Sequence, residues 1–70
     1  MEQYSEAKQA IIDLAVKQIE TRDPRSPVKV ADGRIWRLLG EGESAEWIQF
    51  VFIEELYPTH DGIYARGYRV

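Results

Sequence analysis

The chain has 70 residues, of which 44% are hydrophobic and 30% are charged, and it contains no cysteine. This length allows one domain, 1–70, and excludes multi-domain enzymes and folds built from repeated βαβ units. The net charge of −3 disfavours nucleic acid as a partner, because binding to phosphates usually requires a basic surface. Without cysteine, neither disulfides nor thiolate metal sites can stabilise so small a core.

Residues 1–22 are predicted to form a helix. Ser5 is a suitable N-cap, and Glu6 follows in the first turn, where the helix dipole favours a carboxylate. The helix should end at Asp23, because the proline after it pushes this residue toward an extended conformation. Apolar residues spread over roughly 240° of the helix, whereas packing on one sheet requires only about 100°. We therefore expect the helix to make a second contact.

Strands are predicted for the rest of the chain, after a short linker at 25–27. Runs rich in β-branched and aromatic residues alternate with segments rich in glycine, proline and aspartate. The four predicted strands are 28–30, 34–39, 46–56 and 63–70. The fold class is therefore α+β: an N-terminal helix followed by a four-stranded antiparallel meander over 28–70, either open or curled into a small barrel.

The longest predicted strand is apolar on both of its faces. Strict alternation places Ile48, Phe50, Phe52 and Leu56 on one side and Trp47, Val51, Ile53 and Tyr57 on the other. We assign the first set to the core beneath the helix. The second set, joined by Tyr64 and Tyr68, is expected on a face that one helix cannot cover. Closure into a barrel, a protein partner, or a ligand or nucleic acid on an aromatic surface would each resolve this excess.

This uncovered face is the predicted partner-binding site. Its residues are Trp47, Val51, Ile53, Tyr64, Arg66 and Tyr68. The rings and aliphatic groups would be buried on binding, and Arg66 would orient the partner through a bidentate bond to a carboxylate or a backbone carbonyl. The sequence thus predicts a small, non-enzymatic protein-binding or regulatory module whose simplest partner is a second copy of itself.

A nucleic-acid-binding module is the alternative. Tyr64, Arg66 and Tyr68 alternate along the last strand and could stack on bases, with Arg34, Trp36 and Arg37 extending the surface. Tyrosine and arginine are, however, common on amphipathic edge strands, and the acidic residues would repel a polyanion. The protein-binding hypothesis is therefore favoured.

No catalytic residue, metal site or cofactor is predicted. His60 beside Asp61 could orient a general base, but no nucleophile is recognisable and no acidic or histidine cluster has a diagnostic metal-binding spacing. The longest near-continuous apolar stretch, 47–53, is too short to span a bilayer. A secretory signal is not apparent, so no membrane partner and a cytoplasmic location are expected.

Overall fold

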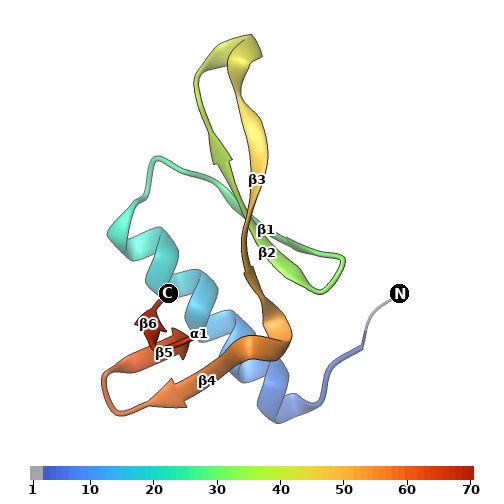
Figure 1. Cartoon of the computed structure of the whole chain (residues 1–70), viewed down its shortest axis with the longest axis vertical. Helices are drawn as coiled ribbons and strands as arrows, with labels where there is room; N and C mark the ends of the chain where they lie inside the picture. The colour runs from blue at the N-terminus through green and yellow to red at the C-terminus, as the bar shows by residue number, and fades with distance from the viewer. Residues whose placement is uncertain (1–2) are drawn as a thin grey trace.

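The computed structural model describes residues 3–70. Helix α1, Glu6–Arg22, starts after Ser5, whose hydroxyl accepts a hydrogen bond from the Lys8 backbone N–H at 3.1 Å. It ends at Asp23, as the sequence predicts. Six antiparallel strands follow and form two sheets (Figure 1). The α+β class with an N-terminal helix is therefore confirmed.

The first sheet has the order β1-β2-β3, with β1 Val28–Ala31, β2 Arg34–Leu39 and β3 Glu46–Phe52. Asp32 and Gly33 both have positive φ and form the tight turn between β1 and β2. The connection from β2 to β3 contains the 3₁₀ turn η1, Gly42–Ser44, and projects from the body of the molecule (Figure 1).

The second sheet has the order β4-β5-β6, with β4 Leu56–Thr59, β5 Gly62–Ala65 and β6 Tyr68–Arg69. The strand expected over 46–56 is therefore divided, because the 3₁₀ turn η2, Ile53–Glu55, interrupts it. The expected turn at 57–62 is largely strand, and the expected last strand bends at Arg66 and Gly67. The two sheets remain separate, so no barrel is closed.

The helix makes the second contact that its broad apolar surface requires. It packs against β4 and β5 of the second sheet and against β1 of the first. Its buried residues Ile12, Ala15 and Ile19 join the inward side chains of both sheets. The core comprises Ile12, Ala15, Ile19, Ile35, Val51, Ile53, Leu56, Ile63, Ala65 and Val70.

The expected division of the long strand into two faces is wrong between residues 48 and 53, whereas Leu56 is in the core and Trp47 and Tyr57 are exposed, as expected. Val51 and Ile53 belong to the core, and Ile53 is only 2% exposed, whereas Ile48 and Phe50 are exposed. The cause is a β-bulge: Trp36 pairs with Gln49, but the preceding Ile35 pairs with Val51, so Phe50 is left as the extra residue. An extra residue in a strand moves each side chain that follows it to the opposite face of the sheet.

Candidate functional site

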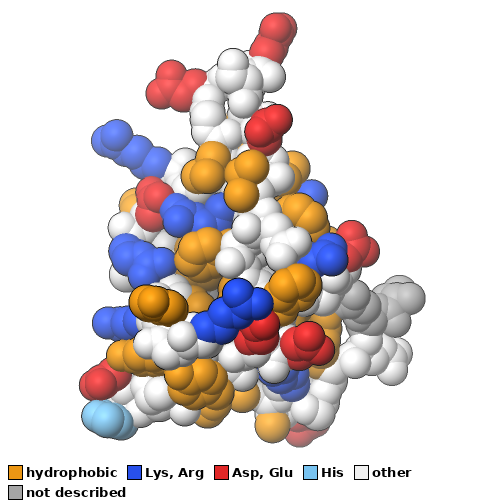
Figure 2. Space-filling model, in the orientation of Figure 1, with side chains coloured by type: hydrophobic (Ala, Val, Ile, Leu, Met, Phe, Trp, Pro, Cys, Tyr) orange, Lys and Arg blue, Asp and Glu red, His pale blue; other side chains and the backbone are white. Residues whose placement is uncertain are grey.

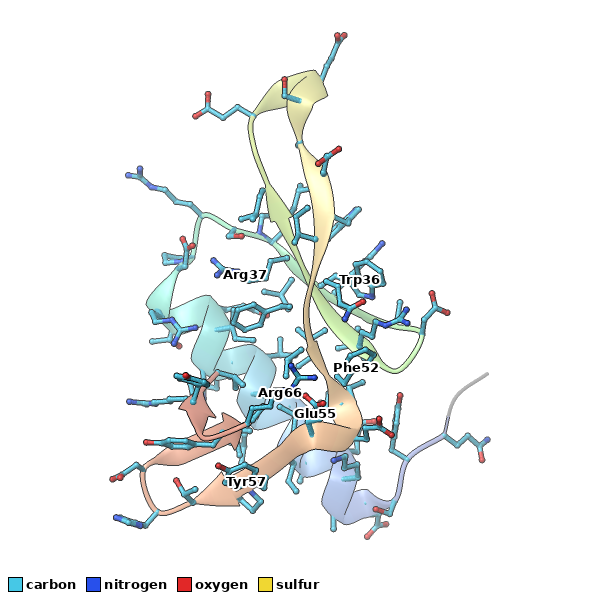
Figure 3. All side chains as sticks on the ribbon, in the orientation of Figure 1. Trp36, Arg37, Phe52, Glu55, Tyr57 and Arg66 are labelled. Carbon is cyan, nitrogen blue, oxygen red and sulfur yellow. The ribbon has the colours of Figure 1, made fainter. Side chains whose placement is uncertain are left out.

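Both faces of the first sheet carry exposed apolar side chains: on the face that includes Ile35, the side chains of Val30, Leu39 and Ile48 are 41–46% exposed. Ile35 and Val51, a cross-strand pair, are buried on the side that contacts the body of the protein. The opposite side, which we call the outer face, can be followed from the register of the three strands. It carries Lys29, Arg34, Trp36, Leu38, Trp47, Gln49 and Phe52. Figure 3 shows Trp36 and Phe52 on one side of the strands and Arg37 on the other.

Rings and cations alternate along the outer face. The Lys29 Nζ lies 4.4 Å from the ring centroid of Trp47 and 5.7 Å from that of Trp36. The Arg34 Cζ lies 5.8 Å from the Trp36 ring and 5.2 Å from the Phe52 ring. These distances are within the range of cation–π attraction. The Trp36 ring is fixed further because its Nε1–H donates to the Ala31 carbonyl at 3.0 Å.

The two cations of the outer face have no carboxylate partner. The ion pairs within residues 3–70 join Arg37 to Asp23, His60 to Asp61 and Arg66 to Glu55, and none involves Lys29 or Arg34. The Arg34 Nε is also buried without a hydrogen-bond acceptor. Lys29 and Arg34 therefore contact aromatic rings, and not carboxylates, on this face.

Trp47 is the predicted site residue that lies on the outer face. It is 39% exposed and pairs across the strands with Leu38. Val51 and Ile53 are core residues, so their expected place on an uncovered surface is incorrect.

Tyr64, Arg66 and Tyr68 do not share one face. Arg66 and Gly67 have positive φ and form the turn between β5 and β6. Tyr64 pairs with Arg69, and Ala65 pairs with Tyr68, so the two tyrosines point to opposite sides of the second sheet. Tyr64 contacts the Tyr57 ring with centroids 6.1 Å apart, whereas Tyr68 is 78% exposed.

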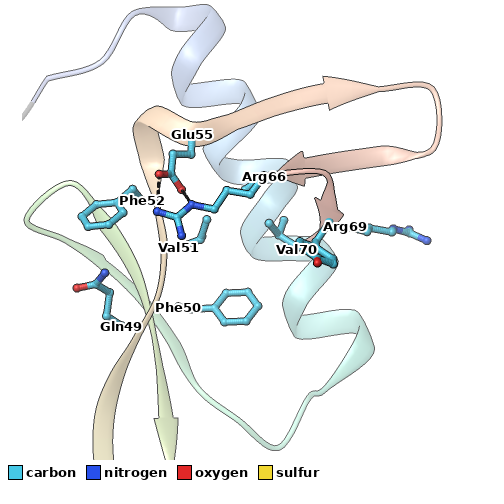
Figure 4. Close-up of a pocket in the computed structure, with 10 residues that line it drawn as sticks. Gln49, Phe50, Val51, Phe52, Glu55, Arg66, Arg69 and Val70 are labelled. Carbon is cyan, nitrogen blue, oxygen red and sulfur yellow. Dashed lines mark hydrogen bonds and ion pairs between the residues drawn. The ribbon is translucent and has the colours of Figure 1, made fainter.

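Arg66 lines a groove of 240 Å³ between β3 and the end of the chain (Figure 4). Its Nη2 donates to Glu55 Oε1 at 3.0 Å, and its Nε lies 2.9 Å from Glu55 Oε2. The hydrogen bond to Glu55, followed by the attraction of its charge, raises the pKa of the Arg66 guanidinium. The carboxylate that Arg66 was expected to take from a partner is thus supplied by this chain.

His60 and Asp61 lie in the turn between β4 and β5. Their side chains are 92% and 62% exposed, and the His60 Nε2 is 3.5 Å from Asp61 Oδ2. In the part of the chain that the structure describes, no group of three histidine or acidic side chains is placed to hold a metal ion. Over the same residues, no helix is long and apolar enough to cross a membrane.

The sequence named Arg34, Trp36 and Arg37 only as an extension of a nucleic-acid surface, and it missed Lys29 and Phe52. Including Arg37 was wrong, because Arg37 lies on the opposite face of β2 and pairs with Asp23. The sequence is sufficient to place Arg34, Trp36 and Leu38 on one face of β2, because alternate residues of a strand share a face. The bulge at Phe50, which brings Phe52 to the same side, has no such signal. Comparison with protein-family models, with curated proteins and with solved structures finds no match for this chain.

Proposed function

We propose that this chain is a small, non-enzymatic protein-binding or regulatory module that binds its partner through the outer face. The supporting observation is the pair of partly exposed tryptophans, Trp36 and Trp47, interleaved with two cations that have no carboxylate partner. Tryptophan and arginine are enriched at the residues that dominate binding energy in protein interfaces. A cytoplasmic location remains a prediction.

The chemistry of the outer face suggests which partner would fit it. Burial of the rings would supply most of the binding energy, since apolar area removed from water is worth about 25 cal/mol per Å². Lys29 and Arg34 would take over the orienting role first assigned to Arg66, by pairing with carboxylates of the partner. The favoured partner is therefore a protein surface that offers apolar groups beside acidic ones.

A photo-crosslinking amino acid placed at Gln49 tests the proposal in the cells that make the protein. Gln49 is exposed on the outer face, and Ala10, exposed on α1, serves as the control position. We expect discrete protein adducts from position 49 that are absent from position 10 and that disappear in Trp47→Ala. Equal adduct patterns from both positions would contradict the proposal.

A single-stranded nucleic acid is the second candidate. The alternation of rings and cations on the outer face supports it better than the strand Tyr64-Arg66-Tyr68 does, because Arg66 is bound to Glu55. The net charge of −3 opposes it. Titration with an oligonucleotide at rising salt separates the candidates, since phosphate binding weakens steeply with salt and burial of apolar surface does not.

A further inference from the structure

We infer that the partner of the outer face is a second copy of this chain, packed face to face with its β2–β3 hairpin running in the opposite direction. This inference rests on the proposed function and names its partner. The supporting observation is the order of charges along the hairpin: the side chains near β1 are positive, and those at the projecting end are negative.

The projecting end of the hairpin is acidic. Glu41, Glu43 and Glu46 lie at or beside the loop between β2 and β3, all exposed, and residues 40–46 include no basic side chain. None of the three is in an ion pair within the described residues 3–70. In Figure 2 the red side chains at the top mark this end, and the uppermost charged side chains of the molecule are all red.

The Leu38–Trp47 pair lies midway between the cations and these acids. Arg34 precedes Leu38 by four residues on β2, and Lys29 pairs with Trp36, two residues before Leu38. Glu41 and Glu43 follow Leu38 by three and five residues. At about 3.4 Å per residue, the cations lie roughly 7–14 Å to one side of this pair and the acids about 10–17 Å to the other.

A two-fold axis that crosses the strands at the Leu38–Trp47 pair would place the positive end of one copy's hairpin against the negative end of the other's. It would place Lys29 and Arg34 of each copy against Glu41 and Glu43 of the other, with Trp47 and Leu38 buried between them. Such an interface is self-complementary, as a two-fold dimer requires. By the same measure Asp32, six residues before Leu38, would come within about one residue of the other copy's Glu43, a like-charge contact at the edge of the interface that weakens the dimer.

The size of the outer face indicates a weak dimer. Three strands at about 4.8 Å spacing and a hairpin about 25 Å long give a small footprint, below the roughly 1,200 Å² total of a standard interface. We therefore expect the dimer to be weak and to dissociate further as salt is added.

Reciprocal charge reversal tests the arrangement by sedimentation at 10 µM to 1 mM protein. Lys29→Glu with Arg34→Glu makes both ends of the hairpin acidic, and Glu41→Lys with Glu43→Lys makes both ends basic. We expect each double variant alone to dimerise at least tenfold more weakly than the unaltered chain. An equimolar mixture should dimerise again, because each face then meets the opposite charge. Lys17→Glu with Arg25→Glu, away from the outer face, is the matched control and should have no effect.

The outcomes separate this inference from the proposed function. A chain that stays monomeric at 1 mM, or a mixture that does not dimerise, overturns the second copy as partner. The outer face remains the binding site if position 49 still crosslinks to another protein. Circular dichroism checks the fold of each variant, and Lys29→Glu alone replaces the first pair if the half-buried Arg34 does not tolerate the change.

Discussion

Gln18 connects the helix to the second sheet through hydrogen bonds to the backbone. Its Nε2 donates to the carbonyls of Ile63 and Val70, and its Oε1 accepts from the Ile63 N–H at 3.0 Å. Gly62 lies against the same amide, and a Cβ at this glycine would collide with Gln18 Oε1. Gln18 thus supplies the acceptor for the Ile63 N–H, whereas the Ile63 carbonyl also accepts from the Val70 N–H and the Val70 oxygen from Arg22.

Replacing Gln18 with leucine should lower the free energy of unfolding by about 1–3 kcal/mol, because the part-buried Ile63 N–H loses its acceptor. Gln9→Leu is the matched control: Gln9 bonds only to the exposed Asp13 on its own helix, and its loss should cost less than about 0.5 kcal/mol. Urea denaturation of both variants measures the difference. Equal losses would contradict the role assigned to Gln18.

Ile53 and Trp47 were expected to share a surface, and their substitution should now give opposite results. Ile53→Ala, at a position 2% exposed, should lower the free energy of unfolding by about 2–5 kcal/mol. Trp47→Ala should lower it by less than this while abolishing binding through the outer face. Thermal melts of dilute protein combined with sedimentation at high concentration distinguish the two effects. A melting temperature that falls more for Trp47→Ala would place Trp47 in the core.

At the scale of the elements, local signals in the sequence are sufficient for the helix and the first turn. Ser5 caps α1, the Asp23-Pro24 step ends it, and Asp32-Gly33 turns the chain. These features depend on neighbouring residues alone. The inward and outward facing of β3 depends instead on its pairing with β2, where one unpaired residue at Phe50 changes which side chains are buried.

The bulge makes a prediction about β3 as an element. Deleting Phe50 should be tolerated better than deleting the adjacent Val51, because Gln49 then precedes Val51 directly and both keep their partners on β2. Deleting Val51 removes the cross-strand partner of the fully buried Ile35. Circular dichroism melts of the two deletion variants test this. A lower melting temperature for the Phe50 deletion would show that the bend of the bulge, and not the pairing, holds β3 in place.

At the scale of the whole molecule, the sequence indicated correctly that the chain has more apolar surface than one helix covers. The helix and two sheets bury the residues of the core, yet apolar side chains stay exposed on both faces of the first sheet and on the second sheet, among them Val30, Leu39, Trp47, Ile48, Tyr57 and Tyr68. The total apolar content follows from the composition, whereas its division between inside and outside depends on the bulge at Phe50 and on the 3₁₀ turn η2 that follows it. This is why Trp47 was placed correctly and Ile53 was not.

The projecting end of the β2–β3 hairpin should contribute to self-association and little to the stability of the fold. Residues 40–45 lie outside the core, and none of them bonds to the helix or to the second sheet through the hydrogen bonds described. Replacing these six residues with Asn-Gly would connect Leu39 to its partner Glu46 by a two-residue turn that suits a hairpin. The replacement would also remove Glu41 and Glu43. We expect the melting temperature to change by only a few degrees.

Self-association of this shortened chain should weaken at least tenfold, because Lys29 and Arg34 of each copy lose the carboxylates that they would meet in the other. Restoring the six-residue loop with glutamine at positions 41 and 43 is the control, since it returns the length of the hairpin without its charge. If that control dimerises like the unaltered chain, the loop acts through its shape. If it stays weak, the two carboxylates carry the effect, and added salt should weaken the dimer of the unaltered chain toward the same value.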